Sequence, residues 1–373
     1  MSTKLTVVSL INTKSIMADF HSLKISDIYK ETKSCSVVTF EVPEDLQSNF
    51  QFTQGQHLTL RQSINDEDVR RSYSLCSSPL DNILRVAIKQ IPGGVFSTYA
   101  NTKLQAGDYL DVMEPSGNFF VDVNAEASNN YIAFAAGSGI TPLLSIIKTH
   151  LTKEPNSTFK LFYVNQTVKS IIFKEAIERL KNEFFGRFQV FYFLTKEQRD
   201  IPFLNGRFDT EKLAILTKTF IDVEDTSDCF ICGPKEMIFL IKDELVAAGM
   251  PSEKIHYELF YSGDNDASNA QISEVLEHKV EGTDVTIIDG GKEFHFIMEE
   301  DYDNILDGAL AAGADLPFAC KGGVCSTCKC KVVEGTVEMK VNYALEASEV
   351  ANNFVLSCQA VPTSEKVKVD FDV

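Results

Sequence analysis

The segment CKGGVCSTCKC, residues 320–330, places four cysteines within eleven positions. Cys320, Cys325 and Cys328 follow the spacing C-x4-C-x2-C, and Cys358 comes after 29 intervening residues, in FVLSCQAVP. This is the plant-type spacing with which four thiolates hold a 2Fe–2S cluster. Three thiolates come from one tight loop and the fourth from a distant strand end, so the pattern predicts an iron–sulfur domain in this part of the chain.

Other residues of the same segment bear on this interpretation. Gly322 and Gly323 would let the loop turn sharply and bring backbone N–H groups near the sulfurs. Cys330 does not fit the spacing, and we interpret it as a buried thiol in the strand CKCKVVEG. Zinc is the alternative to iron, because C-x-x-C pairs often bind it. A zinc site usually has two close pairs, whereas here the fourth cysteine is isolated.

Length, charge and cysteine content bound the class of protein. A chain of 373 residues suggests two or three domains. The net charge of −18 disfavours nucleic acid, since no basic surplus is available to neutralise phosphates. No apolar run approaches the roughly 20 residues that span a bilayer, and the first residues do not have the features of a secretory signal. A tight group of cysteines in such a chain is typical of reduced cytosolic thiols, so we expect a cytoplasmic protein with no membrane partner.

Upstream of the cysteines, two patterns of secondary structure divide the chain. From about residue 20 to 122, short alternating or β-branched runs predict a barrel or sandwich, namely CSVVTFEV, HLTLRQ, RRSYSL, ILRVAIK and YLDVMEP. From 130 to about 261, strands such as YIAFAAG, TFKLFYVN and DCFICG alternate with helical segments. That alternation predicts a parallel sheet with helices on both faces. The polar stretch SGDNDASNAQ, 262–271, reads as a linker.

Two segments of the first part are candidates for a flavin site. RSYS would supply a cation for a pyrophosphate from Arg71, an aromatic face for the isoalloxazine from Tyr73 and a small donor near its N5 from Ser74. An ordinary amphipathic strand explains this tetrapeptide about as well. The second segment, GGVFSTYAN, opens a predicted helix, where backbone N–H groups form an anion site. Its candidate contacts are Gly93, Gly94, Val95 and Ser97.

Two turns of the second part are candidates for a nicotinamide nucleotide site. In AAGSGITPLL, Gly137 and Gly139 follow a strand, and Thr141 is expected to cap the next helix, with Pro142 as its first residue. A dinucleotide pyrophosphate could lie there on backbone amides and the positive end of the helix dipole. CGPKEM, which begins at Cys232, is also a strand that leads into a helix. Both turns should therefore open at the carboxyl edge of one sheet.

These motifs together resemble a known family. PFACKGGVCSTCKCKVVEG, NYALE and LSCQAVP are similar to the ferredoxin domain of phenylacetyl-CoA epoxidase reductase subunits, and the upstream motifs resemble the ferredoxin–NADP reductase superfamily. The resemblance implies an antiparallel β-barrel flavin domain, an α/β parallel-sheet nicotinamide-binding domain and an α+β ferredoxin-like (β-grasp) iron–sulfur domain. It places FAD, in preference to FMN, in the barrel. The expected boundaries are an arm at 1–21, the FAD barrel at 22–125, the NAD(P) domain at 126–261, a linker at 262–277 and the ferredoxin domain at 278–373.

The resemblance also assigns roles to residues. Cys232 and Gly233 would lie beside the nicotinamide, and YELF would bring Glu258 and Phe260 near the flavin. We expect Ser74, Cys232 and Glu258 to form the catalytic group. The resemblance favours NADPH, with NADH possible. Thr195, Lys196 and Arg199 could meet a 2′-phosphate beyond the sheet, although a solvated loop explains the lysine and arginine almost as well. Many relatives have Asn-Arg where this chain has Asn165-Gln166, which removes one candidate phosphate contact.

The combination predicts how electrons move. A nicotinamide delivers two electrons as a hydride, a 2Fe–2S cluster accepts one at a time, and a flavin can connect the two. Since no Glu-x-x-His pair for a di-iron centre is visible, the substrate chemistry should occur on a partner. By resemblance this partner is the di-iron oxygenase that epoxidises phenylacetyl-CoA. The alternatives are the reductase of another hydroxylase and a non-enzymatic redox carrier or sensor, which would leave two nucleotide sites unexplained.

Overall fold

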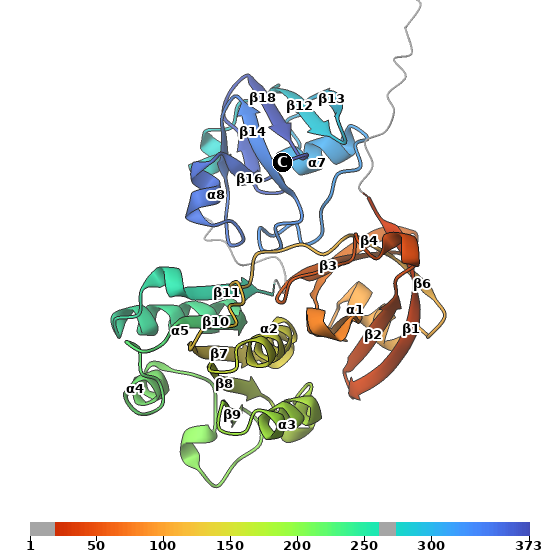
Figure 1. Cartoon of the computed structure of the whole chain (residues 1–373). Coiled ribbons are helices and arrows are strands. Elements are labelled where there is room, and N and C mark those ends of the chain that lie inside the picture. The colour runs from red at the N-terminus through yellow and green to blue at the C-terminus, as the bar shows by residue number, and fades with distance from the viewer. Residues whose placement is uncertain (1–18, 261–273) are drawn as a thin grey trace, which may run out of the picture. The chain divides into compact units, whose positions relative to one another are not determined.

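The computed structural model describes residues 19–260 and 274–373 (Figure 1). These residues form two compact units, one mainly from 20 to 260 and the other mainly from 274 to 373. The N-terminal arm as far as residue 18 and the predicted linker at 262–271 lie outside the described residues. No helix in the described ranges is both long and apolar enough to cross a membrane.

An antiparallel β-barrel forms the first part of the larger unit, as predicted. The strand order is β4-β3-β6-β1-β2-β5, and an isolated bridge between Leu75 and Val86 joins the two ends of this order. The five predicted strands are present, but β1 was missed because only Leu23 and Ile25 of its twelve residues are fully buried. The elements are β1 (His21–Thr32), β2 (Cys35–Glu41), β3 (His57–Ile64), β4 (Glu67–Ser74), β5 (Leu84–Lys89), α1 (Val95–Thr102) and β6 (Tyr109–Val112).

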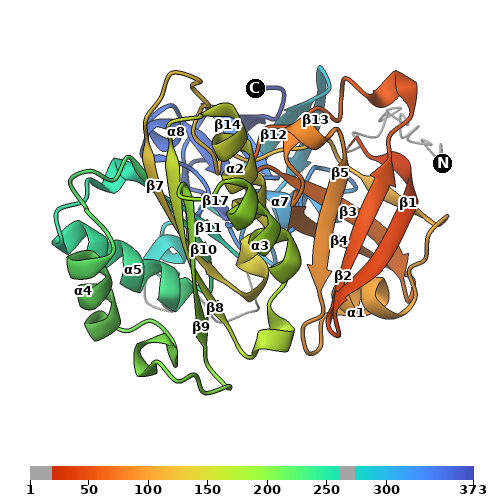
Figure 2. The same ribbon diagram turned by 60° about the horizontal axis from the view of Figure 1, so that its bottom comes forward.

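A five-stranded parallel sheet in the order β11-β10-β7-β8-β9 forms the second part of this unit. Helices α2 and α3 lie on the side of the sheet toward the barrel, and α4 and α5 lie on the other side (Figure 2). This confirms the α/β prediction, although α4 and β11 were not predicted as separate elements. The elements are β7 (Asn130–Ala136), α2 (Ile140–Lys153), β8 (Thr158–Asn165), α3 (Lys174–Glu183), β9 (Phe188–Leu194), α4 (Thr210–Thr219), β10 (Asp228–Gly233), α5 (Lys235–Ala247) and β11 (Ile255–Leu259).

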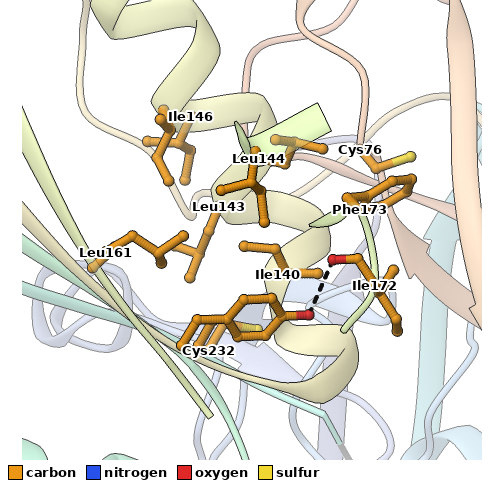
Figure 3. Close-up of a cluster of buried hydrophobic side chains, with 14 of the residues drawn as sticks. Cys76, Ile140, Leu143, Leu144, Ile146, Leu161, Ile172, Phe173 and Cys232 are labelled. Carbon is orange, nitrogen blue, oxygen red and sulfur yellow. Dashed lines mark hydrogen bonds between the residues drawn. The ribbon is translucent and has the colours of Figure 1, made fainter. Parts of the chain in front are cut away.

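The barrel and the parallel sheet share one apolar core. Cys35 and Cys76 of the barrel belong to the same buried cluster as Ile140 and Leu143 of α2, part of which Figure 3 shows. Polar contacts border this core: the hydroxyls of Ser78 and Thr149 lie 2.7 Å apart, Ser145 Oγ donates to the Ser77 carbonyl at 2.7 Å, and Lys148 pairs with Asp81. Burial of so much apolar surface fixes the barrel against the carboxyl edge of the sheet.

The second unit has the predicted α+β, β-grasp architecture. Its mixed sheet has the order β13-β12-β18-β14-β16, in which β12 and β18 are parallel, and α7 supplies Ile305 and Leu306 to the core. Asn304 caps α7 by accepting a hydrogen bond from the Asp307 N–H at 2.9 Å. The elements are β12 (Asp284–Asp289), β13 (Lys292–Ile297), α7 (Ile305–Ala311), β14 (Lys329–Glu334), β15 (Val337–Met339), α8 (Ala347–Ala351), β16 (Phe354–Leu356), β17 (Ala360–Pro362) and β18 (Lys366–Asp370).

A fully buried carboxylate ties the C-terminal end of α2 to the sheet. Glu154 accepts hydrogen bonds from the Asn124 N–H at 3.1 Å, Ser157 Oγ at 2.7 Å and Tyr131 OH at 3.0 Å, and its other partner is His150 Nδ1 at 3.0 Å. Burial would raise the pKa of this carboxyl, but the hydrogen bonds outweigh burial and hold the pKa below its usual value. Burial lowers the pKa of His150.

We predict that acid destabilises the larger unit through this pair. Unfolded His150 has a pKa near 6.5 and folded His150 a lower one, so the unfolded state binds more protons below about pH 6.5. The lowered carboxyl pKa has the same sign, because the stabilisation by Glu154 is lost as pH falls through its folded pKa. Chemical denaturation should show the free energy of unfolding falling below pH 6.5, by at most about 1.4 kcal/mol per pH unit for one proton.

The control for this prediction is an exposed histidine. His295→Gln should keep the pH dependence, whereas His150→Gln should flatten it between pH 6.5 and 5. An equal slope in His150→Gln and the unaltered protein would show that another group is responsible.

Candidate functional site

The cysteine loop lies between α7 and β14 and contains an unusual concentration of left-handed backbone. Lys321, Gly323 and Ser326 have φ values of 52°, 73° and 50°. Such conformations are uncommon for residues other than glycine, and they curl a short loop tightly. The Gly322 N–H points to Cys320 Sγ at 3.3 Å, as expected if backbone donors stabilise a thiolate there.

The fourth cysteine reaches the same loop through the sheet. Ser357 N–H donates to the Cys328 carbonyl at 3.0 Å, so Cys328 and Cys358 lie close together where β14 begins and β16 ends. Both are 3 % exposed. Gln359, which the sequence analysis did not single out, binds both parts: its Nε2 donates to the Lys321 carbonyl at 2.9 Å and lies 3.5 Å from Cys358 Sγ.

These features fit a cluster held by four thiolates. Three or more histidine, cysteine or carboxylate side chains do not converge on a single-ion position anywhere in the described residues. The fit of a 2Fe–2S cluster therefore rests on the curled loop, the spacing and the N–H groups directed at sulfur. Cys330 is fully buried in β14 opposite Val355, where burial first and the nearby Cys358 second raise the pKa of its thiol.

In the larger unit, the structure brings Ser74, Cys232 and Glu258 together. Ser74 is the last residue of β4 in the barrel, and its Oγ donates to Glu258 Oε2 at 2.8 Å. Cys232 and Glu258 are register partners on the parallel strands β10 and β11, and Cys232 Sγ lies 4.0 Å from the same oxygen. Three side chains predicted from separate motifs thus meet where the barrel contacts the carboxyl edge of the sheet.

Burial sets the protonation states of Glu258 and Cys232. Burial raises the pKa of Glu258 to about 7, although the hydrogen bond from Ser74 opposes the rise. Burial also raises the pKa of the Cys232 thiol, so the thiol stays neutral near pH 7. The site therefore contains a carboxyl group that changes charge near neutral pH beside a neutral thiol and a hydroxyl.

The two predicted flavin segments lie close together in the barrel. Tyr73 packs against Phe96 of α1 with ring centroids 5.7 Å apart, and burial raises the pKa of its hydroxyl. Arg71 is exposed on β4, where its Nη1 donates to the Arg70 carbonyl at 2.7 Å. Its guanidinium remains accessible for an anion at this strand.

The glycine turn before α1 leaves helix donors available. Gly94 is the N-cap and makes no side-chain cap bond, and Gly93 has φ +74° with open space around it, while Val95 begins the helix. The first N–H groups of such a helix can bind an anion. Ser97 lies inside the helix rather than at its start: its Oγ accepts from the Ile91 N–H at 3.3 Å and donates to the Gly94 carbonyl at 3.4 Å.

The glycines of the turn after β7 have the close contacts and the backbone conformation expected of a dinucleotide-binding turn. A Cβ on Gly139 would lie 2.1 Å from the Cys232 carbonyl oxygen, so only glycine permits the turn after β7 to approach the end of β10 this closely. Gly137 has φ +54°, and Gly233 lies against Ala136. As predicted, both turns open at one edge, because β7 and β10 are parallel neighbours.

The predicted capping role of Thr141 is wrong. A short 3-10 turn, Gly137–Gly139, runs directly into α2, so the helix begins at Ile140, with Gly139 as its N-cap. Thr141 is therefore already inside the helix, and its Oγ1 donates to the Ser138 carbonyl at 3.0 Å. Pro142 is the third helical residue rather than the first. No side chain caps the helix, but the Ile140 N–H donates to the Ser138 carbonyl and Pro142 has no N–H, so a ligand would be met by the N–H groups of the preceding turn and of Thr141.

The remaining candidates lie farther out along the sheet edge. Thr195 follows β9, with its N–H donating to the Asn165 carbonyl at 2.9 Å. Arg199 is exposed, and its Nη1 donates to the Tyr192 carbonyl at 3.3 Å. Phe260 packs against the core that the barrel and sheet share.

Lys89 is a candidate that the sequence analysis missed. A Cβ on Gly137 would lie 2.8 Å from Lys89 Nζ, so an ammonium from barrel strand β5 lies beside the glycine turn of the sheet. Within the described residues this ammonium makes no hydrogen bond or ion pair. A lysine that ends a strand carries no signal by itself, and only the packing of the two parts reveals its position.

Comparison with known proteins agrees with these parts. Family models match residues 22–121 (oxidoreductase FAD-binding domain), 134–243 (oxidoreductase NAD-binding domain) and 287–363 (2Fe-2S iron-sulfur cluster binding domain). The chain is 43% identical over 356 residues to a component of 1,2-phenylacetyl-CoA epoxidase from Escherichia coli (strain K12), covering 95% of this chain and 99% of that protein. The chain belongs to the family of reductase components that includes this protein. It is an NAD(P)H-dependent oxidoreductase with FAD and a 2Fe–2S cluster.

A second relative and one solved structure share this domain organisation. The ferredoxin reductase component of 3-ketosteroid-9-alpha-monooxygenase from Rhodococcus rhodochrous is 31% identical over 94% of this chain and 96% of its own length. The solved structure of phthalate dioxygenase reductase has a TM-score of 0.55 at 20% identity, covering 94% of this chain and 98% of that one. At that identity the likeness supports the fold. The reductase relatives are components of oxygenase systems, which supports the same kind of partner here.

The cluster ligands can be tested by comparing two cysteines. We predict that Cys358→Ala loses most of its iron and acid-labile sulfide, because a ligand is removed. Cys330→Ala should keep both, since its thiol is buried in β14 and lies outside the predicted set of four ligands. Elemental analysis and the visible spectrum would check both variants. Loss of the cluster in Cys330→Ala, with Cys358→Ala unaffected, would contradict the assignment.

Proposed function

We propose that this chain is the reductase of an oxygenase that epoxidises phenylacetyl-CoA, and that it carries electrons from NADPH through FAD and the 2Fe–2S cluster to a di-iron oxygenase. The observation that carries the proposal is the meeting of Ser74, Cys232 and Glu258 at the carboxyl edge of the nucleotide-binding sheet. The relative with 43% identity supports the substrate and partner. The location we infer is the cytoplasm, because the cluster ligands must stay reduced.

Two anion sites would hold the nucleotides. The uncapped N-terminus of α2, the turn of Gly137 and Gly139 and the Lys89 ammonium would bind the pyrophosphate of NADPH. The N-terminus of α1, with Arg71 on the neighbouring barrel strand, would bind that of FAD. Thr195 and Arg199, at the outer end of the same edge, would meet the 2′-phosphate that distinguishes NADPH from NADH.

When bound, a flavin accepts a hydride and releases electrons singly, which matches the one-electron cluster. The residues of the site would place the two rings and control charge between them. Ser74 Oγ would lie by the flavin, and Cys232 by the nicotinamide. The Glu258 carboxyl holds a proton below about pH 7 and loses it above, and Ser74 Oγ donates a hydrogen bond to its Oε2.

A prediction follows for the pH dependence of flavin reduction. A carboxylate at Glu258 opposes the arrival of a hydride, because both add negative charge to a buried site. The rate of flavin reduction by NADPH should therefore fall as pH rises through about 7, the pKa of Glu258. Glu258→Gln, which stays neutral, should flatten the profile in stopped-flow measurements. If Glu258→Gln keeps the same inflection, another group titrates.

The partner can be tested by reconstitution. With NADPH, oxygen and the epoxidase oxygenase of the same organism, the chain should support consumption of phenylacetyl-CoA. The domain of residues 278–373 carries 17 acidic and 8 basic residues, so delivery to a partner with a basic surface should slow as salt rises. Flavin reduction by NADPH should change less.

The control for the reconstitution is the Cys358→Ala variant. Cys358→Ala should reduce ferricyanide with NADPH, a reaction that needs only the flavin, yet fail to support the oxygenase. Turnover of a steroid monooxygenase system, with phenylacetyl-CoA untouched, would instead favour the role of the relative with 31% identity.

A further inference from the structure

The carbonyl of Gly137 is held from behind by a buried tyrosine. Tyr163 is fully buried on β8, directly opposite Ala135 of β7 in the parallel register. Its hydroxyl donates to the Gly137 carbonyl at 2.8 Å and lies 3.3 Å from the Ile172 carbonyl. Side chain and turn are thus joined at the first peptide after β7.

The orientation of this peptide matters for an anion. A turn binds a pyrophosphate when its N–H groups face the ligand and its carbonyl oxygens face away. Gly137 has φ +54°, a conformation from which a glycine can rotate with little steric resistance. Without a donor behind it, the Gly137 carbonyl could turn its partial negative charge toward the bound phosphates.

The tyrosine is itself held in place by its surroundings. Ile172 precedes Phe173, which has φ 60° although it is a bulky residue. The Phe173 N–H donates to Glu31 Oε1 of the barrel at 2.9 Å, which fixes this strained segment. Burial raises the pKa of Tyr163 well above its usual value, and the adjacent Asn165 amide partly opposes the rise. The hydroxyl therefore remains a donor across the working pH range.

We propose that Tyr163 is a positioning residue for the pyridine nucleotide: its hydroxyl holds the Gly137 carbonyl away from the pyrophosphate, so that the donors of the turn and of α2 face the ligand. The proposal rests on the assignment of the Gly137–Gly139 turn to the nucleotide. Tyr163 touches no reacting atom, and its effect should appear in nucleotide binding rather than in the rate of hydride transfer.

The test is Tyr163→Phe, which removes one oxygen. Isothermal titration calorimetry should show the dissociation constant for NADP+ rising about tenfold, the loss expected when one hydrogen bond no longer orders the donors. Inorganic pyrophosphate should inhibit competitively with NADPH, and its inhibition constant should rise by a similar factor. The rate of flavin reduction at saturating NADPH should change less than about twofold, since that step does not use the turn.

A matched variant separates positioning from stability. Tyr131→Phe also removes a buried hydroxyl, from β7 near the opposite edge of the same sheet, where Tyr131 OH donates to Glu154. It should lower the melting temperature by a similar amount and leave NADP+ binding unchanged. Replacing Tyr163 by 4-aminophenylalanine, which retains an N–H donor at the same place, should restore most of the affinity.

A second variant separates the role of Tyr163 from the assignment of the Gly137–Gly139 turn to the nucleotide. Lys89→Met removes the ammonium beside Gly137 and should weaken NADP+ binding if the turn is the nucleotide site. If Lys89→Met weakens binding while Tyr163→Phe does not, the turn binds the nucleotide and Tyr163 has no positioning role. If both variants bind NADP+ as the unaltered protein does, the site assignment itself is overturned. Equal affinity in the phenylalanine and 4-aminophenylalanine variants would also contradict the proposal.

Discussion

The chemistry of this protein depends on the apolar core that the barrel shares with helix α2. This core holds the end of β4 against the ends of β10 and β11. Ser74 Oγ of the barrel therefore lies 2.8 Å from Glu258 Oε2 of the sheet. Neither part could assemble the site by itself, because the hydroxyl comes from one and the carboxyl and thiol from the other. The same packing partly buries Glu258, and its removal from water raises the pKa of that carboxyl to about 7.

Two glycines occupy positions in the turn after β7 where a side chain would not fit or the backbone is left-handed. At Gly139 the turn approaches the end of β10 so closely that a Cβ would overlap the Cys232 carbonyl oxygen. At Gly137 the chain takes a left-handed turn that leaves its carbonyl available to Tyr163. In the site that we propose for the nucleotide, backbone N–H groups would be the donors, and the Gly137 carbonyl is bonded to the buried Tyr163. Anion binding by helix N-termini needs that arrangement more than it needs any particular charged residue.

Much of this architecture could be predicted from the sequence, for physical reasons that differ between elements. The cysteine spacing is a local signal, since three sulfurs must come from one loop, and the strands β2 to β6 contain alternating, β-branched or aromatic runs that can be recognised. Strand β1 was not predicted because half of its side chains are exposed and only two are buried, so its pattern resembles a polar segment. Thr141 was given the wrong role because a 3-10 turn moved the helix start, which composition does not encode.

The contacts that escaped prediction are the long-range ones. Ser74 and Glu258 were each identified, but the hydrogen bond between residues 184 positions apart comes only from the packed structure. Lys89 and Gln359 belong to no recognisable motif. Their roles follow from their neighbours, which are the Gly137 turn for Lys89 and the Lys321 carbonyl of the cysteine loop for Gln359.

The measurement that tests the account most directly is the deuterium isotope effect on flavin reduction. NADPH deuterated at C4 of the nicotinamide, on each face in turn, would be mixed with the protein and with Ser74→Ala under stopped flow. If hydride transfer occurs at the group of Ser74, Cys232 and Glu258, one face gives a primary isotope effect, and Ser74→Ala slows that step by at least about tenfold while keeping the effect. An unchanged rate in Ser74→Ala, with the same isotope effect, would show that the hydride is transferred elsewhere.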